Sequence, residues 1–567
     1  MFSFSVNFRS KKVLHGLFCL GIAAFALCLL LFNIRLDEHL TPANLAGFQT
    51  LYIPFFGNKA FSSKVSDTWL TLPKKLSPVK KSVQERWKEL GNLSDYECVA
   101  WRQTQKCTPD GLLEPKYNSS CDSSISRGVS GYCEIRHRGS GTILRVLEMH
   151  CRSLRIRVKI KCSDFKLYLG YGPPALKYVH DTPKNAFGMC PTLQDGGIMR
   201  GSEKRENTTE TAIHPRDGIA IVIHGRVLES VYASVRSLRL MGCELPIELW
   251  YKPQELDPAV HPILVKLLRT GLVANITIRA IEDQRFKRFY TKFYAVYYSN
   301  FQRVLLLDAD NFAVRDPTYL FKSDIFGKTG AIFWPDFWHS RKSIFNIHPE
   351  SFVWDVLDLD YVDMFEQESG QVLIDRCRHH RALDTLMYYG LHAHVLEKTR
   401  IVWGDKDLFR FAWMKSNSTF YMIKRPPGSA GLKLSDHDLF CGVTIVQYDM
   451  HNEILFLHRN QEKFSPKKYG YIWHHIQEFY PTKVGASLAD YIVRGANGGK
   501  YYPQFRRCFG KDADYKGIFT VKSIRQYHFA FLENQLIDFL LEIIPITTLV
   551  PHDSRQRGQI RSEKRDS

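Results

Sequence analysis

Strand-like and helix-like patterns of apolar residues alternate along the chain from residue 217 to residue 307. Four short, mostly apolar runs are typical of strands buried on both faces: Ile219–His224, Ile247–Tyr251, Asn275–Arg279 and Val304–Leu307. Between them, apolar residues recur at helical spacing in three segments: Val227–Leu238, 258–269 and Phe289–Tyr298. Gly242 and Gly271 follow the first two segments and are suitable helix ends. Strands that alternate with helices through short links predict an α/β domain with a mostly parallel sheet and helices on both faces.

A longer apolar run lies near the N-terminus. Val13–Phe32 contains only one strongly polar residue in 20, and a helix of roughly 20 residues spans a bilayer. Arg9, Lys11 and Lys12 precede the run, so the tail should be cytosolic and the rest of the chain lumenal. A cleaved signal peptide is the alternative, but its apolar region is usually shorter, roughly 7–15 residues. We therefore expect one transmembrane helix that acts as an uncleaved signal-anchor.

The next region is rich in cysteine. Six of the eleven cysteines beyond the membrane segment fall within residues 98–162, without a Cys-x-x-Cys pair or histidines at zinc spacing. This predicts a disulfide-stapled module in an oxidising compartment, although the spacing does not reveal the pairing. The odd number leaves at least one thiol outside an internal disulfide. Arg155–Lys161 alternates strictly and is expected to be a strand. Five glycosylation sequons also lie on the lumenal side, at Asn92, Asn118, Asn207, Asn275 and Asn417.

These patterns divide the chain into seven parts. They are a cytosolic tail (1–12), the transmembrane anchor (13–32), a stem (33–95), the Cys-rich module (96–195), a linker (196–216), the α/β domain (217–465) and a C-terminal extension without an assigned role (466–567). The 44% hydrophobic content excludes a disordered chain. The net charge of +19 comes from terminal and scattered residues, with no basic run interleaved with aromatics. We therefore expect no nucleic-acid partner, and a basic surface facing a membrane or an anionic substrate.

The fourth predicted strand runs directly into two acids. Val304–Leu307 is followed by Asp308, Asp310 and Asn311. Ligands of mostly parallel sheets bind at the carboxyl ends of the strands, where these acids emerge. Two carboxylates one residue apart can hold Mg²⁺ or Mn²⁺ and leave positions open for phosphate oxygens. The alternative is a pair of solvated acids in a turn.

Seven segments together resemble the fungal Golgi α-mannosyltransferases that extend mannan branches. They follow the family's order: Ser237–Tyr251, Leu306–Asn311, Asp316–Phe321, Gly330–Trp338, Glu368–Gln371, Gly404–Trp413 and Phe456–Asn460. The Cys-rich module and the chain after about residue 470 lie outside the resemblance. It implies a GT-A glycosyltransferase, with a Rossmann-like sheet, a nucleotide-sugar donor and a divalent metal.

The resemblance also implies roles for particular residues. Asp308 and Asp310 match the family's metal and diphosphate motif, and His458 matches a late histidine that completes the metal shell in related enzymes. An imidazole ligand suits Mn²⁺ better than Mg²⁺, so Mn²⁺ is expected and Mg²⁺ is the alternative. A core histidine is the other interpretation of His458. Asn311, and His224 at the end of the first strand, are expected among the donor-binding residues.

Two more donor-binding candidates have competing interpretations. Arg459 could pair with the diphosphate, or form an ordinary surface salt bridge. Trp334 and Asp336 could form the floor of a loop beside the donor, with the tryptophan stacking on it. They could equally belong to the edge of an aromatic core.

Four polar residues are candidates for catalysis. Glu368 and Gln371 flank a glycine in a short polar segment, which could be a turn beneath the sugar ring or a helix start capped by Ser369. Asp405 and Asp407 precede an amphipathic segment and could bind sugar hydroxyls. A helix N-cap is the competing role for Asp405.

The implied protein is a single-pass type II membrane enzyme of the Golgi. It would transfer mannose from GDP-mannose to a mannose-rich glycan or glycoprotein with retention of configuration. Retention could proceed through a covalent glycosyl-enzyme on Glu368. It could also proceed on one face of the sugar, with the leaving diphosphate accepting the proton. Two alternatives stay open: a transferase that uses another nucleotide-sugar such as a UDP-hexose, and an inert lumenal glycan-binding protein.

Overall fold

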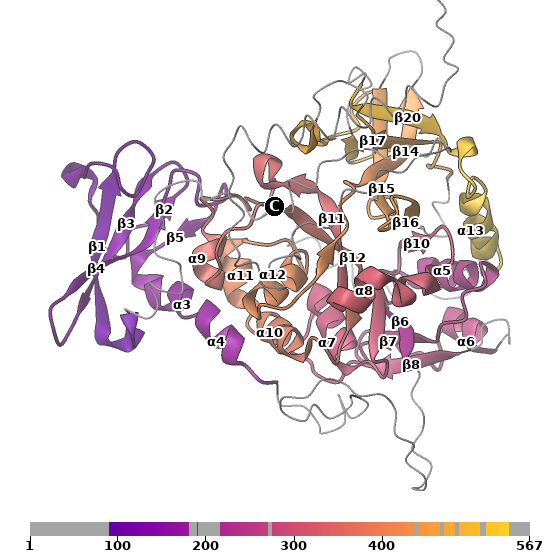
Figure 1. Ribbon diagram of the computed structural model, residues 1–567, viewed down its shortest axis with the longest axis horizontal. Helices are drawn as coiled ribbons and strands as arrows, with labels where there is room; N and C mark the ends of the chain where they lie inside the picture. The colour runs from indigo at the N-terminus through magenta and orange to yellow at the C-terminus, as the bar shows by residue number, and fades with distance from the viewer. Residues whose placement is uncertain are drawn as a thin grey trace, which may run out of the picture. The chain divides into compact units, whose positions relative to one another are not determined.

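The computed structural model describes residues 90–180, 190, 216–269, 275–434, 439–464, 470–481, 487–510 and 517–543 (Figure 1). The expected membrane anchor, most of the stem and the linker lie outside these residues. Within the described ranges, no helix has the length and apolar character needed to span a membrane.

A seven-stranded sheet forms the centre of the predicted α/β domain, in the order β13-β11-β12-β9-β6-β7-β8. Its strands are β6 (Asp217–Val222), β7 (Ile247–Tyr251), β8 (Ile276–Ala280), β9 (Arg303–Leu307), β11 (Ala331–His339), β12 (Phe365–Asp375) and β13 (Tyr421–Met422). Pairing is parallel among β9, β6, β7 and β8 and between β11 and β13, whereas β12 is antiparallel to both neighbours. The predicted α/β class with a mostly parallel sheet is therefore confirmed.

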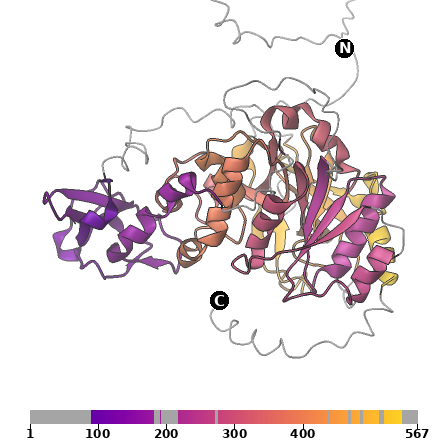
Figure 2. The same cartoon turned by 90° about the horizontal axis from the view of Figure 1, so that it is seen from below.

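Strand β9 illustrates why its sequence is apolar throughout. Val304 and Leu306 enter one hydrophobic core, whereas Leu305 and Leu307 enter the other, and each side chain is at most 1% exposed. Helices supply both cores, so layers flank the sheet on its two faces (Figure 2). The first core contains α7 (Thr291–Tyr298), α9 (Val353–Leu357), α10 (His380–Leu391), α11 (His394–Thr399) and α12 (Leu408–Lys415). The second contains α5 (Leu228–Leu240), α6 (Pro262–Arg269), α8 (Asp324–Thr329) and α13 (Leu532–Leu541).

A second sheet of eight strands, all antiparallel, was not anticipated. Its main path is β10-β16-β15-β14-β17-β20, and β18 and β19 join it through β15. The strands are β10 (Asn311–Ala313), β14 (Gly428–Leu434), β15 (Leu439–Tyr448), β16 (Ile454–His458), β17 (His475–Phe479), β18 (Arg494–Ala496), β19 (Cys508–Gly510) and β20 (Phe519–Ser523). Four of them follow residue 465, so the expected domain boundary there cuts through one sheet. The C-terminal region completes the domain instead of extending it.

The Cys-rich module is built on a three-stranded antiparallel sheet, β1-β3-β4. Its elements are β1 (Tyr96–Thr104), β2 (Ile125–Ser126), β3 (Ser130–His137), β4 (Ile143–Met149), β5 (Lys159–Ile160), α3 (Phe165–Leu169) and α4 (Gly172–Lys177). The predicted strand Arg155–Lys161 is wrong except for β5, because Arg157 adopts a left-handed conformation (φ 69°) that interrupts an extended chain.

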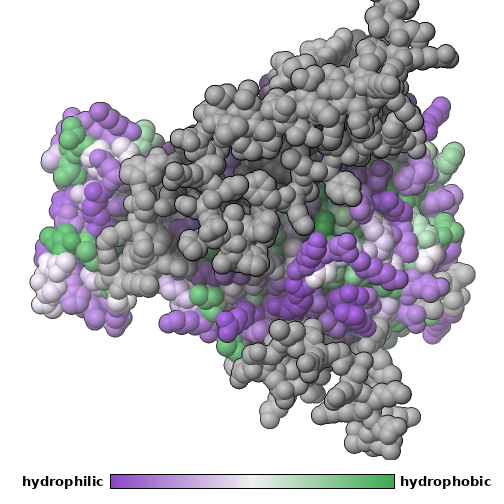
Figure 3. All heavy atoms as spheres, in the orientation of Figure 1, coloured by the Kyte–Doolittle hydropathy of each residue, from purple (hydrophilic) through white to green (hydrophobic). Residues whose placement is uncertain are grey.

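Disulfides staple the module as expected. The six cysteines within residues 98–162 pair with one another: Cys98–Cys121, Cys107–Cys151 and Cys133–Cys162. Of the two further bridges, Cys190–Cys377 links the expected module to the α/β domain, and Cys441–Cys508 lies within that domain. Cys243 is buried and unpaired, which accounts for the odd cysteine. On the described surface visible in Figure 3, hydrophilic side chains predominate and hydrophobic ones form small separate patches.

Candidate metal and donor site

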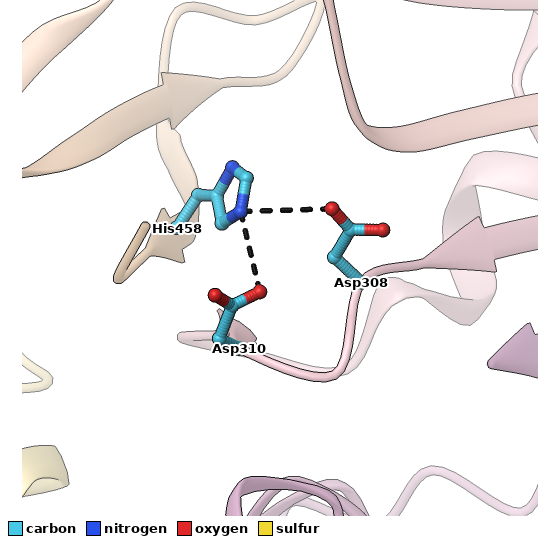
Figure 4. Close-up of side chains that lie close together, drawn as sticks. All are labelled: Asp308, Asp310 and His458. Carbon is cyan, nitrogen blue, oxygen red and sulfur yellow. Dashed lines mark ion pairs between the residues drawn. The ribbon is translucent and has the colours of Figure 1, made fainter. Parts of the chain in front are cut away.

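The two acids lie where the chain passes from one sheet to the other. Asp308 directly follows β9, and Asp310 directly precedes β10. Strand β10 pairs with β16, and this register places Asn311 opposite His458. His458 Nε2 lies 3.3 Å from Asp310 Oδ1 and 3.7 Å from Asp308 Oδ2 (Figure 4). Each residue offers one ligand atom, and the three atoms lie within 4.8 Å of one another.

A glycine in β12 makes room for the imidazole. A Cβ atom on Gly370 would lie 2.5 Å from His458 Nδ1 and 2.7 Å from its Cε1. The Gly370 carbonyl also accepts hydrogen bonds from the backbone N–H of Asp308 (2.8 Å) and from Asn311 Nδ2 (2.8 Å). Strand β12 therefore forms a close wall against the three-residue cluster, and only a glycine fits there without displacing the ring.

Charged groups crowd around this cluster. Lys292 Nζ bridges Asp308 Oδ1 (2.7 Å) and Asp405 Oδ2 (2.9 Å), while Lys463 Nζ reaches Asp310 Oδ2 at 2.7 Å. Glu368 Oε1 lies 3.4 Å from His458 Nδ1. Four carboxylates thus meet only two lysines, so two negative charges are left for a cation or a proton to balance.

The pKa values reflect that imbalance. Burial alone would lower the pKa of His458, but the charges of Glu368 and Asp310, with hydrogen bonds to both, raise it to about 10. Burial likewise opposes ionisation of Glu368, yet His458 outweighs it and lowers that pKa to about 2. His458 and Lys463 hold the pKa of Asp310 well below its usual range despite complete burial. The cluster is built for negative carboxylates beside a positive charge.

A divalent cation fits this donor set. Two carboxylates and one imidazole offer oxygen and nitrogen ligands from rigid strand ends, a combination better suited to Mn²⁺ than to Mg²⁺. The imidazolium proton of His458 provides a positive charge where the cation would bind, and a metal would have to displace that proton. Asp308, Asp310 and His458 are therefore the residues that would hold the ion.

A second buried charge network lies in the neighbouring segment 405–410. Lys406 Nζ contacts Asp336 Oδ2 (3.2 Å), Asp407 Oδ2 (3.3 Å) and Glu366, and Arg410 Nε donates to Asp407 Oδ1 (2.7 Å). All five residues are buried. Burial raises the pKa of Asp336 to about 7, helped by the charges of nearby acids and opposed by Lys406. This network holds α12 against the ends of β11 and β12.

Three candidate residues do not have the local structure that the sequence predicted for them: Glu368, Gln371 and Asp336. Glu368 and Gln371 lie in neither a turn nor a helix start, since both belong to the buried strand β12. Asp336 does not lie in a loop but in β11, where Trp334 is fully buried and donates its indole N–H to the Tyr448 carbonyl (2.8 Å). The interpretation of Trp334 as part of an aromatic core is the one that agrees with the structure.

Asp405 is not a helix cap. The N-cap of α12 is Asp407, with φ 68° and no capping side-chain hydrogen bond. Asp405 turns towards Lys292, and Asp407 accepts from the backbone N–H of Gln367 (2.8 Å) and from Arg410. Asp405 thus reaches the metal cluster through one lysine, whereas Asp407 belongs to the second network.

The other donor-binding candidates divide into buried and exposed. Arg459 is 1% exposed, and its guanidinium pairs with Glu533 of α13 at 2.5 Å. Arg459 therefore forms a buried ion pair, which is neither the diphosphate contact nor the surface salt bridge that the sequence suggested. Asn311 and Gln371 are fully buried and bond to each other at 2.6 Å, so they support the site from behind. His224 lies at the surface, and partial desolvation of its ring and the charge of Lys463 lower its pKa.

Sequence reasoning missed three lysines and one acid, Lys292, Lys406, Lys463 and Glu366. Lys292 carries a usable signal, because it is the only charged residue in the aromatic stretch Tyr290–Tyr298. A buried lysine requires an acidic partner. Lys406 stands between two acids in the sequence, and such a segment is indistinguishable from an ordinary solvated run of charges.

Residues 216–449 match the family model described as "Mannosyltransferase putative". This segment is similar to the mannosyltransferase family. The α-1,2-mannosyltransferase MNN2 of Saccharomyces cerevisiae is 27% identical over 328 residues, which cover 50% of this chain and 55% of that protein. MNN5 of the same yeast is 24% identical (44% and 51% covered), and MNN21 of Candida albicans is 27% identical (46% and 48%). The chain spans about half the length of these relatives.

Among solved structures, the mannosyltransferase Ktr4p from S. cerevisiae aligns with a TM-score of 0.27 at 12% identity, over 40% of this chain and 74% of that one. The galactosyltransferase LgtC aligns with a TM-score of 0.27 at 14% identity, over 36% and 72%. Of the three candidate metal ligands, Asp308 and Asp310 lie inside the segment of the mannosyltransferase family match, and His458 follows it.

Proposed function

We propose that this chain is a metal-dependent α-mannosyltransferase of the GT-A type, which transfers mannose from GDP-mannose to a mannose-rich glycan with retention of configuration. The observation that carries the proposal is the convergence of Asp308, Asp310 and His458, almost 150 residues apart in sequence, within a segment that largely matches the mannosyltransferase family. The MNN2, MNN5 and MNN21 relatives, named as α-1,2-mannosyltransferases, support this sugar.

The chain's own residues have distinct tasks in this proposal. A bound divalent cation would supply positive charge against the leaving diphosphate. Lys463 is 51% exposed and can turn from Asp310 towards an incoming phosphate. Lys292 fixes Asp308 and Asp405 from the buried side. Glu368 is ionised at neutral pH, so it can stabilise positive charge that develops on the sugar, or act as the nucleophile of a covalent route.

The proposed setting is the Golgi membrane, with the apolar segment 13–32 as a type II anchor and the domain in the lumen. The five disulfides support an oxidising compartment. Enzymatic removal of N-glycans should shift the expressed protein on a gel. An unshifted band for the full-length protein would contradict the lumenal orientation.

A screen of nucleotide-sugars tests the activity. The full-length protein, in detergent, is incubated with manganese and each of GDP-mannose, UDP-glucose and UDP-galactose, with and without an α-linked mannotriose. We expect transfer from GDP-mannose alone, abolished by chelator. Turnover of a UDP-hexose would favour the other donor class, and binding of the trisaccharide without turnover of any donor would favour an inert glycan-binding protein.

A further inference from the structure

Trp403 is exposed, whereas the other tryptophans among the described residues are buried. Eight tryptophans fall within the described residues, and seven of them are at most 5% exposed, whereas Trp403 is 60% exposed. Its ring stacks on Phe345, with centroids 6.1 Å apart and an interplanar angle of 30°. The guanidinium of Arg155 lies 5.4 Å from the centroid of Phe345 and 6.0 Å from that of Trp403. We call these three side chains the aromatic platform.

The side chains of the platform come from both the α/β domain and the Cys-rich module. Phe345 and Trp403 belong to the α/β domain, whereas Arg155 belongs to the Cys-rich module. The loop that carries Arg155 is held in place, because the Ser153 hydroxyl donates to the Glu350 carbonyl (2.6 Å) and the Ser153 carbonyl accepts from the Phe352 N–H (3.0 Å). Ser153 is 3% exposed. The module therefore presents Arg155 from a fixed position.

The platform is also continuous with the candidate active site. Lys406, three residues after Trp403, places its Nζ 4.2 Å from the centroid of the Phe345 ring and 3.2 Å from Asp336 Oδ2. Asp405, two residues after Trp403, contacts the lysine that holds Asp308. One short segment thus connects the exposed indole to both buried charge clusters.

We propose that the aromatic platform binds a hexopyranose unit of the acceptor glycan, and that the Cys-rich module contributes to this subsite through Arg155. The inference rests on the proposed transferase function. The negative face of an exposed indole attracts the weakly positive C–H groups on one face of a pyranose ring. An adjacent guanidinium offers several hydrogen-bond donors to the sugar hydroxyls. Free phosphate would instead need several clustered cations.

Isothermal titration of an α-linked mannotriose into the full-length protein tests the site without any turnover. We expect Trp403→Ala to raise Kd about tenfold and Trp403→Phe to stay within about threefold of wild type. Arg155→Ala should weaken binding in the same direction. In transfer assays, the KM for the acceptor should rise in Trp403→Ala while the KM for the nucleotide-sugar stays nearly constant.

Phe531→Ala is the matched control, since Phe531 is 73% exposed and lies at the N-cap of α13. It should bind the trisaccharide as the wild type does, and thermal midpoints should show that all variants are folded. Wild-type affinity in Trp403→Ala would overturn the platform, and wild-type affinity in Arg155→Ala would overturn the module's part in it. If the wild type turns over no nucleotide-sugar, the proposed function fails, whereas the titration still decides whether the platform binds glycan.

Discussion

A single methyl group added at residue 370 should disable the candidate metal site. The Cβ of Gly370→Ala would lie 2.5 Å from His458 Nδ1, whereas ordinary contact begins at 3.4 Å, so the ring must retreat by about 0.9 Å. Metal–ligand distances tolerate only about 0.2 Å. Misplaced ligand support commonly costs about 10–100-fold in metal affinity, and we expect a loss of that size in Mn²⁺ affinity.

The assay is titration of Mn²⁺ followed by electron paramagnetic resonance, together with manganese-dependent transfer. Gly327→Ala is the control, because a Cβ there meets nothing within 4 Å. Both variants are melted thermally, since overpacking can also cost about 1–3 kcal/mol. If Gly370→Ala is unstable, adding His458→Ala should restore stability by removing the clash. Wild-type Mn²⁺ affinity in Gly370→Ala would refute the packing argument.

Three further predictions concern charged residues. Asp310→Asn should reduce manganese-dependent transfer by about 10²–10³, matching the wild type in chelator; near-normal metal-dependent activity would show that Asp310 is no ligand. Since the pKa of Asp336 is raised to about 7, stability from its protonated form is complete below 3.8 and is lost as pH rises through 7. The thermal midpoint of Asp336→Asn should therefore rise relative to that of the wild type as the pH increases from 5 to 8. A difference that stays constant over this range would contradict the raised pKa of Asp336. Glu533→Gln should destabilise the protein by about 3–5 kcal/mol in denaturant titrations, because it leaves the buried charge of Arg459 without its carboxylate partner; an unchanged midpoint would mean that this ion pair does not stabilise the fold.

The alternating strands and helices of the domain could be predicted from the sequence. A strand that is buried on both faces is apolar at every position, and this pattern is easy to recognise. Predicted and observed bounds agree for Ile247–Tyr251, and they differ by one residue at Val304–Leu307, which begins at Arg303 in the structure. Helix α5 likewise ends just before Gly242, whose φ of 84° suits a glycine. In these elements the local sequence pattern is enough to predict the secondary structure.

Strand β12 could not be predicted in the same way. Its residues Glu366–Gln371 are polar, yet all are buried, because their partners come from distant segments. Gln371 bonds to Asn311, and Glu368 faces His458. A local pattern rich in polar groups and glycine is typical of a turn, so tertiary contacts decided the conformation against that pattern. The second sheet was missed for a related reason, since its short antiparallel strands are joined only by long-range pairing.

The same distinction explains why the acids of the site were recognised and their lysines were not. Asp308 and Asp310 are placed by one strand, and a strand that ends in two carboxylates is visible in six residues of sequence. Lys292 reaches Asp308 from a helix, and Lys463 reaches Asp310 from a loop beyond β16. Their positive charges lower the cost of gathering four carboxylates, but not enough to neutralise them. The remaining negative charge raises the pKa of His458 to about 10, so a divalent ion that binds there would have to replace a proton. The site thus attracts a cation because its negative charge is only partly balanced. The charged residues come from several segments, so no single segment of the sequence reveals this balance.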